Sequence, residues 1–153
     1  MPLKLQIVTP ERILFEEEGV TSVTLTGVDG ELTILPSHSP LMTQLRPGPL
    51  LFRKGGDEVD VALSGGFLEV RDDRVVVLAD TAERSDEIDQ ARAEEARRRA
   101  QTQLASREGE MDIALVLAAL ERAQARLRVV ERRRRRGADR GAPRPTAQQP
   151  PQP

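Results

Sequence analysis

The sequence predicts an α+β fold whose N-terminal half is mainly β and whose C-terminal half is helical. Up to residue 83 the chain consists of short runs that alternate apolar and polar side chains between Gly, Pro and Asp breaks. This pattern is typical of an all-β sandwich or barrel of about eight to ten strands. Later apolar residues recur at helical spacing, and the end is rich in Gly, Ala, Pro and Gln. We therefore expect a β domain in residues 1–83, a helical hairpin in 84–136 and a disordered tail in 137–153.

β-branched residues and turn signals delimit the expected strands. Asp29-Gly30 separates two such runs, and Gly55-Gly56 is the turn of an expected hairpin. Four prolines between residues 36 and 49 interrupt the pattern. We expect strands at residues 3–8, 20–26, 31–35, 50–54, 58–63, 67–70 and 74–79.

The first helix is expected to begin near Ser85. Ser85 is the predicted N-cap, and Asp86, Glu87 and Asp89 would lie in the first turn, where the helix dipole favours acidic side chains. A loop containing Gly109 would end this helix.

The second helix is expected to begin after Asp112 and to pack antiparallel to the first. The predicted seam contains Ala93, Ala96, Ala100 and Leu104 on the first helix, and Ile113, Val116, Leu117, Leu120, Ala123, Leu127 and Val130 on the second. Because an alanine-rich seam buries little apolar area, worth ~25 cal/mol per Å2, we expect a weakly held hairpin that can open.

The composition excludes several classes of function. Aromatic residues make up 2% of the chain, so a module that stacks nucleic-acid bases on aromatic rings is not expected. The chain has no Cys and one His, which argues against a disulfide framework and a Cys or His metal site. No apolar run approaches the ~20 residues of a membrane helix, and no secretory signal is evident. We therefore expect a soluble intracellular protein.

Charge divides the chain where the pattern changes. Residues 1–82 carry a net charge of −6 and residues 83–153 a net charge of +4. The run Arg132–Arg136 is either a solvated helix end or a patch for an acidic partner. One alternative function is therefore a basic helical-hairpin adaptor that binds an acidic protein surface or, less favoured, nucleic acid.

A hydrolase is a second rival interpretation, built on three residues. His38 and Ser39 lie in a Pro-bracketed turn, and Ser64 precedes two glycines. Neither serine has the strand–turn–helix setting of a nucleophile. We expect no catalytic residue here and a structural or interface role for His38.

Arginine spacing on the two helices indicates a possible polyphosphate site. Arg92 and Arg99 are seven residues apart, and Arg122 and Arg126 are four apart, so each pair lies on about one helix face. In a closed hairpin these side chains could converge on phosphates, since each guanidinium donates two parallel hydrogen bonds. Spacing alone favours ordinary surface arginines.

Three motifs ahead of the helices are more specific. They are Gly30 to Leu41 (GELTILPSHSPL), Leu63 to Val70 (LSGGFLEV) and Val77 to Glu83 (VLADTAE). In this order they resemble the epsilon subunit family of the F-type (rotary) ATP synthase, and the resemblance runs from about Leu3 to Arg133. Thr33 and Ser37 stand where this family usually has Gly.

The resemblance implies a ten-stranded sandwich of two five-stranded sheets in a non-catalytic rotor subunit of the central stalk. The implied partners are the gamma subunit, the membrane c-ring and, when the hairpin extends, the beta and alpha subunits of the catalytic head, with no nucleic acid. Glu31 and His38 would lie at the c-ring interface. The implied location is peripheral, on the cytoplasmic face of a bacterial plasma membrane, through the complex.

The resemblance also gives the hairpin a regulatory role. Extended, it would inhibit ATP hydrolysis through a basic helix, with Arg122, Arg126, Arg128, Arg132 and Arg133 as the candidate inhibitory residues. No cofactor is required. Some family members bind regulatory ATP on the folded hairpin through a motif that Ile88 to Ala93 match in full. The implied ATP-binding residues are Glu83, Ile88, Asp89, Arg92, Ala93, Arg99, Arg122 and Arg126.

Overall fold

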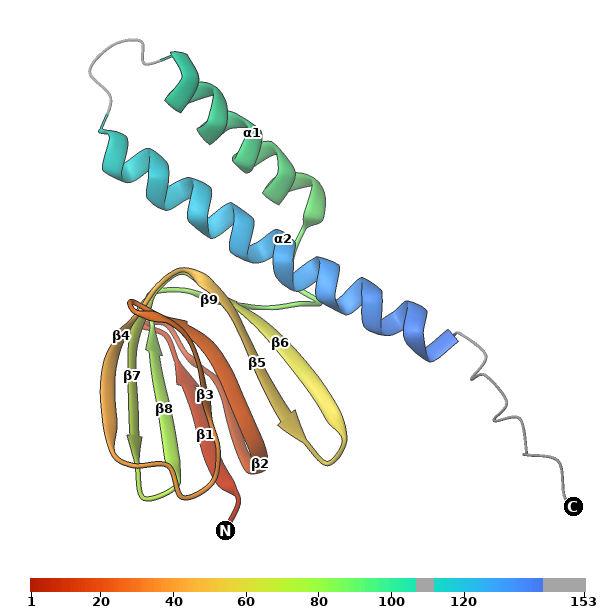
Figure 1. The fold of residues 1–153 in the computed structure, drawn as a ribbon. Coiled ribbons are helices and arrows are strands. Elements are labelled where there is room, and N and C mark those ends of the chain that lie inside the picture. The colour runs from red at the N-terminus through yellow and green to blue at the C-terminus, as the bar shows by residue number, and fades with distance from the viewer. Residues whose placement is uncertain (107–111, 142–153) are drawn as a thin grey trace, which may run out of the picture.

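The structure, a computed structural model, describes residues 1–106 and 112–141. A β-sandwich lies below a pair of helices, and the second helix crosses above one edge of the sandwich (Figure 1). The predicted fold class is confirmed. The loop predicted around Gly109 and the tail from residue 142 lie outside the described residues.

The sandwich contains nine strands in the part of the chain that is described. They are β1 (Leu3–Val8), β2 (Ile13–Gly27), β3 (Gly30–Ile34), β4 (Leu41–Leu45), β5 (Gly48–Lys54), β6 (Asp57–Leu63), β7 (Gly66–Arg71), β8 (Arg74–Ala79) and β9 (Ala82–Arg84). One layer runs β4-β7-β8-β1 and ends on the first half of β2. The other contains β3, the second half of β2, β5, β6 and β9.

Each layer contains five strands although the sandwich has nine, because strand β2 contributes to both layers. It runs from Ile13 to Gly27, whereas the sequence predicted only residues 20–26 as a strand. Its first half pairs with β1 and its second half with β3 and β5, so β2 belongs to both layers. Gly19, at φ 74°, lies where the strand passes between them. A residue without Cβ adopts this backbone conformation at little cost, which permits the bend.

The core lies between the two layers and is aliphatic. Leu3, Leu5 and Ile7 point inward from β1, and Phe52 from β5 packs edge-on against Phe15 at 5.3 Å between ring centroids. At the start of β7, a Cβ on Gly66 would collide with the carbonyl oxygen of Leu78, so the LSGGFLEV motif requires glycine at this close approach of two strands.

Helix α1 spans Gln90–Ser106, so the predicted start near Ser85 is wrong. The carboxylate of Asp89 accepts a hydrogen bond from the Arg92 backbone N–H at 3.2 Å and caps the helix. Ser85 instead directly follows β9, and its backbone N–H donates to the Asp60 carbonyl at 3.3 Å. The residues between them form a turn that carries the chain from the sandwich to the helix, so Asp86 and Glu87 are not in the first helical turn.

Helix α2 spans Ile113–Gly141 and is longer than predicted, because it continues past Gly137 into the expected tail. Asp112 caps it as predicted, accepting from the Ala114 N–H at 3.0 Å. Arginine is a good helix former, and one interior glycine costs only about 1 kcal/mol, so the helix propagates.

Helix α2 packs on two partners. It contacts α1 on one side and strands β5 and β6 on the other. Ala123, Ala125 and Val129 are its buried residues. Ile113 and Leu117 of the predicted seam are about half exposed, because they lie near the hairpin tip, away from the sandwich.

Candidate functional site

A groove of about 530 Å³ lies where β9, the start of α1 and α2 meet. Six of the eight predicted ATP-binding residues line it, and Glu87, Glu95 and Ala96 complete the lining. The predicted residues in the lining are Glu83, Asp89, Arg92, Ala93, Arg99 and Arg126. The fold therefore brings together residues more than 40 positions apart along the chain.

The α1 side of the groove is built on the helix N-terminus. Asp89 caps the helix, and the backbone N–H of Ala93 donates to the Asp89 carbonyl at 3.0 Å. Ala93 is buried and has the smallest chiral side chain, which leaves space beside the first turn. The Asp-x-x-Arg-Ala spacing thus sets a cap, a cation and a small residue on one turn.

An ion pair between Arg126 and Glu83 closes the α2 side of the groove. The Arg126 Nε donates to both Glu83 oxygens at 3.0 and 3.1 Å, and Nη2 donates to Oε1 at 2.7 Å. Both side chains are about two-thirds buried. Charge-assisted hydrogen bonds of this geometry are among the stronger ones in proteins. This pair joins the hairpin to the last strand of the sandwich.

Two arginines that line the groove already pair with carboxylates. Arg99 donates to Glu95 at 2.9 Å on its own helix, and Arg126 is held by Glu83. A polyphosphate in the groove would therefore exchange carboxylate partners for phosphate oxygens on both arginines. Glu95 was not among the predicted ATP-binding residues, although its position four residues before Arg99 indicates this ion pair.

Two predicted residues lie beside the groove. Arg122 lines a small crevice under α2 with Ser64, Thr81 and Arg126. Ile88 is half-buried in the turn before α1 and is not among the lining residues.

Family models match both parts of the chain. Residues 2–85 match the beta-sandwich domain of the ATP synthase delta/epsilon chain, and residues 86–131 match the long alpha-helix domain of the same chain. The chain belongs to the epsilon-chain family of ATP synthases. The match of the second domain ends at residue 131, so the arginine run lies outside the segment that this family model matches.

Individual epsilon chains are similar over most of their length. The ATP synthase epsilon chain of Herpetosiphon aurantiacus is 48% identical over 89% of this chain and 99% of its own length. That of Dehalococcoides mccartyi is 53% identical over 87% of this chain and 95% of its own.

Solved structures support the fold. A chain in a cryo-EM structure of the Euglena gracilis mitochondrial ATP synthase (OSCP/F1/c-ring) has a TM-score of 0.73 at 26% identity, covering 81% of this chain and 78% of that chain. A chain in a central stalk/c-ring structure from Tetrahymena thermophila has a TM-score of 0.54 at 18% identity over 87% and 96%, which supports the fold alone.

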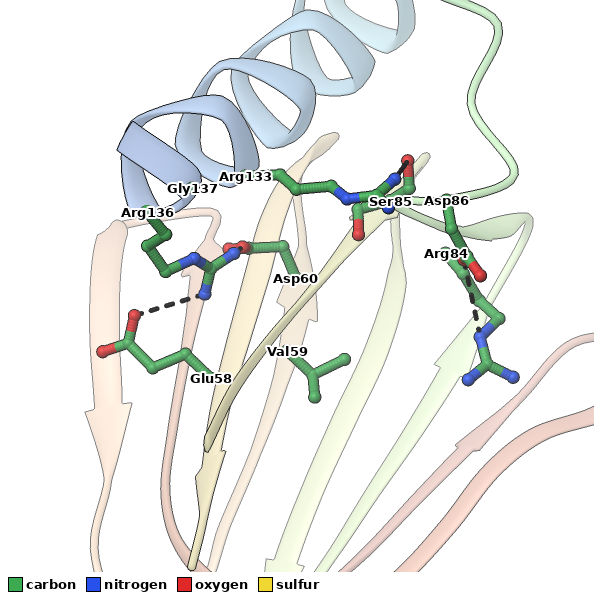
Figure 2. Close-up of a pocket in the computed structure, with 9 residues that line it drawn as sticks. All are labelled: Glu58, Val59, Asp60, Arg84, Ser85, Asp86, Arg133, Arg136 and Gly137. Carbon is green, nitrogen blue, oxygen red and sulfur yellow. Dashed lines mark hydrogen bonds and ion pairs between the residues drawn. The ribbon is translucent and has the colours of Figure 1, made fainter. Parts of the chain in front are cut away.

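The arginine run contacts the sandwich in this conformation. Arg136 lies between Glu58 and Asp60 of β6, and Arg133 donates to the Ser85 carbonyl at 3.4 Å (Figure 2). The hydrogen bond from Arg53, together with Arg136, holds the pKa of Glu58 below its ordinary value of 4.5 against the opposing effect of partial burial. The Glu58-Val59-Asp60 alternation places both carboxylates on one strand face, but no local pattern shows that Arg136 lies between them.

Of the predicted inhibitory residues, Arg126 and Arg133 contact the sandwich as described. Arg122 and Arg132 are half-buried, the first beside Arg126 and the second beside Glu31 and Arg135. Arg128 is exposed on the outer side of α2.

The two predicted c-ring residues lie at opposite ends of β3. Glu31 follows the β2–β3 turn and lines a pocket with Arg132 and Arg135. His38 lies in the loop after β3, where its Nδ1 is 2.7 Å from the Ser39 carbonyl oxygen. Next to it, Ser37 keeps the left-handed conformation, φ 64°, at a position where glycine is expected, and its N–H donates to the Asp73 carboxylate at 2.7 Å.

The hydrolase interpretation receives no support from geometry. Ser64 Oγ accepts hydrogen bonds from Thr81 N at 2.8 Å and Thr81 Oγ1 at 2.7 Å, which tie two strand ends together. His38 lies at the other end of the β4 and β7 strands. Within residues 1–106 and 112–141, no cluster of three His, Cys, Asp or Glu is placed to hold a metal ion. None of the helices described is long and apolar enough to cross a membrane.

Proposed function

We propose that this chain is a central-stalk rotor subunit of an F-type ATP synthase whose hairpin inhibits ATP hydrolysis when it extends. In this proposal the sandwich binds the gamma subunit and the c-ring, and the extended hairpin reaches the alpha and beta subunits. The chain then lies peripherally at the cytoplasmic face of the bacterial membrane, through the complex. The family membership supports this assignment over the nucleic-acid adaptor and the hydrolase.

The proposal includes ATP as a regulatory ligand of the closed hairpin. The supporting observation is the groove, which is lined by Asp89 at the cap of α1, by Arg92 and Arg99 of α1 and by Arg126 of α2. A ligand that contacts both helices and β9 binds only when the hairpin is closed. Such a ligand shifts the population toward the closed form by its differential affinity.

The sandwich offers an apolar face for the gamma subunit. Met42, Phe67 and Leu78 are 72%, 54% and 53% exposed, and they point outward from β4, β7 and β8. Phe67 and Leu78 are directly paired in register. Large apolar side chains exposed together on one sheet face favour a protein contact. The proposal assigns this face to gamma.

The first test removes the hairpin. We expect the assembled ATP synthase to hydrolyse ATP faster when its epsilon chain ends after Arg84, the last residue of β9, than when the chain is complete. The control is binding of the truncated chain to the gamma subunit, which the sandwich alone supports. Equal hydrolysis rates with both chains bound would contradict the brake.

The second test is a calorimetric titration of the complete chain with ATP. We expect Arg99→Ala to weaken binding by about tenfold or more, because a charged hydrogen-bond donor is lost. Arg99 contacts only Glu95 of its own helix in the described structure, so the substitution leaves the contact with the sandwich intact.

The matched control is Arg98→Ala. Arg98 lies next to Arg99 and is exposed, and it does not line the groove. The same loss of charge there should leave ATP affinity unchanged. Equal weakening in both variants would indicate a general charge effect and would remove the groove from the proposal.

A further inference from the structure

A buried carboxylate of the sandwich is neutralised by an arginine of the hairpin. Asp60 of β6 is 1% exposed and is the only buried charged residue among the described side chains. Its carboxylate pairs with the guanidinium of Arg136, which also contacts Glu58 at 3.2 Å. Figure 2 shows the Arg136 side chain reaching down from α2 between the two acidic side chains.

We propose that Arg136, Glu58 and Asp60 form a charge latch that holds the hairpin closed independently of bound nucleotide. The inference rests on the proposed function, in which the hairpin leaves the sandwich. It adds a second attachment point and assigns the arginine run a role in the closed state.

The balance of charge explains why the latch favours closure. Among the described residues, the cation that pairs with the Asp60 carboxylate is Arg136 of α2, whereas Arg53 is bound to Glu58 at 2.8 Å and Arg84 lies 3.8 Å from Asp86. Without Arg136 the closed form would leave a buried charge unpaired, which is strongly unfavourable. In the open form water solvates Asp60, so the penalty applies to the closed form alone.

The latch is separate from the groove. None of its three residues lines the groove, and Arg136 lies ten positions after Arg126, about 15 Å along the helix. Helix α2 is thus attached at Glu83 by Arg126 and at Glu58 and Asp60 by Arg136. Because one rigid helix carries both contacts, forming one raises the effective concentration of the other.

The latch also masks part of the basic surface. Arg133 donates to the Ser85 carbonyl, and Arg134 donates to the Gln90 side chain at 2.8 Å. In the closed form these cations already have partners on the sandwich side or on α1. The arginine run therefore opposes extension until the latch opens.

The test measures the open fraction of the complete, isolated chain without nucleotide. Because the sequence has no Cys, spin labels on Gln44→Cys of β4 and Leu115→Cys near the hairpin tip report one distance. Both side chains are exposed. We expect Arg136→Gln to lower the ratio of closed to open molecules by about tenfold or more.

The matched control is Arg135→Gln. Arg135 carries the same charge one position earlier, and its partner is Glu131 of the same helix at 2.6 Å. We expect less than about a twofold change there, as for an exposed helical ion pair. Closed fractions that are equal in the Arg136→Gln and Arg135→Gln chains would overturn the latch.

A double-mutant cycle provides a second measurement, and its Glu58→Gln background leaves Asp60 unchanged. In a Glu58→Gln or Asp60→Asn background, Arg136→Gln should have a smaller effect than in the parent, since interacting residues are not additive. Full additivity in both backgrounds would also overturn the latch.

The assembled enzyme separates failure of the latch from failure of the brake. If truncation after Arg84 accelerates hydrolysis but Arg136→Gln leaves inhibition unchanged, the brake stands and the latch is wrong. If the isolated Arg136→Gln chain opens but truncation has no effect on hydrolysis, the latch stands and the proposed inhibition is wrong.

Discussion

Different interactions stabilise the sandwich and the helical hairpin. The sandwich buries large apolar side chains between its layers, including Leu5, Ile7, Phe52 and Leu68. Among the helix residues whose burial is described, the buried ones are Ala93, Ala100, Ala123, Ala125 and Val129. Because the free energy of burial scales with apolar area, the first region is stable by itself and the second depends on its neighbour.

Ion pairs contribute to the attachment of the hairpin, which buries less apolar area than the sandwich core does. The contacts from α2 to the sandwich include the Arg126–Glu83 pair and the Arg136–Glu58–Asp60 cluster. Water compensates separated charges, whereas it does not compensate exposed apolar surface. A region docked by small residues and ion pairs can therefore leave while the sandwich stays folded, which is the property that a mobile regulatory hairpin requires.

The largest expected effect comes from truncating the sandwich core. Phe52→Ala should lower the free energy of unfolding by about 3–5 kcal/mol, because it removes a ring packed against Phe15 and leaves a cavity. Urea unfolding of the complete chain measures this loss. A loss below about 1 kcal/mol would contradict the statement that apolar burial in the core stabilises the sandwich.

A smaller effect, confined to the helices, is expected from overpacking α2. Ala123 is fully buried, so Ala123→Leu should cost about 1–3 kcal/mol in docking. Hydrogen exchange should show lost protection in α1 and α2 while β1 and β8 stay protected. Ala114→Leu, at an exposed position of the same helix, is the control and should change neither. Loss of protection throughout the sandwich would contradict the independence of the two regions.

A still smaller effect is expected at Ser37. Its left-handed backbone is unfavourable for an L side chain by roughly 1–2 kcal/mol, so Ser37→Gly should stabilise the sandwich by about 1 kcal/mol after the added chain entropy of glycine is counted. The backbone hydrogen bond to Asp73 is kept. Urea unfolding checks this, and destabilisation would mean that the Ser37 side chain contributes a favourable contact.

The smallest effect is a response to acid. Arg53 lowers the pKa of Glu58 in both forms because both residues belong to the sandwich, and Arg136 lowers it further in the closed form alone. The Arg136 contribution to closure is therefore present at neutral pH and is lost as the pH falls through the lowered pKa. The charged groups around Glu58 are Arg53 of β5, Asp60 of its own strand, Glu31 of β3, and Arg132, Arg135 and Arg136 of α2. We expect the closed-to-open ratio to fall about two- to threefold on protonation. The spin-label distance measures it, and Glu58→Gln should remove the Glu58 part of the response.

Local patterns predicted most of the elements but not all of their ends. The alternation of apolar and polar residues located β1 and β5 to β8. Gly66 of the LSGGFLEV motif lies where the backbones of β7 and β8 approach so closely that only glycine fits. The start of α1 was misplaced because Ser85 and Asp89 are both good caps, and the choice between them depends on the turn that connects β9 to the helix. The extent of β2 was missed because Glu16 to Glu18 resemble a surface run.

The sequence by itself determined a β domain, a weakly apolar helical pair, and the family to which the chain belongs, because these depend on periodicity and short motifs. It also supplied most of the residues that line the groove. Only the tertiary structure decided that Arg126 pairs with Glu83 and that Arg136 neutralises Asp60. These contacts join residues far apart in the chain, and charge pairing follows from where the helix lies on β6, which no local pattern specifies.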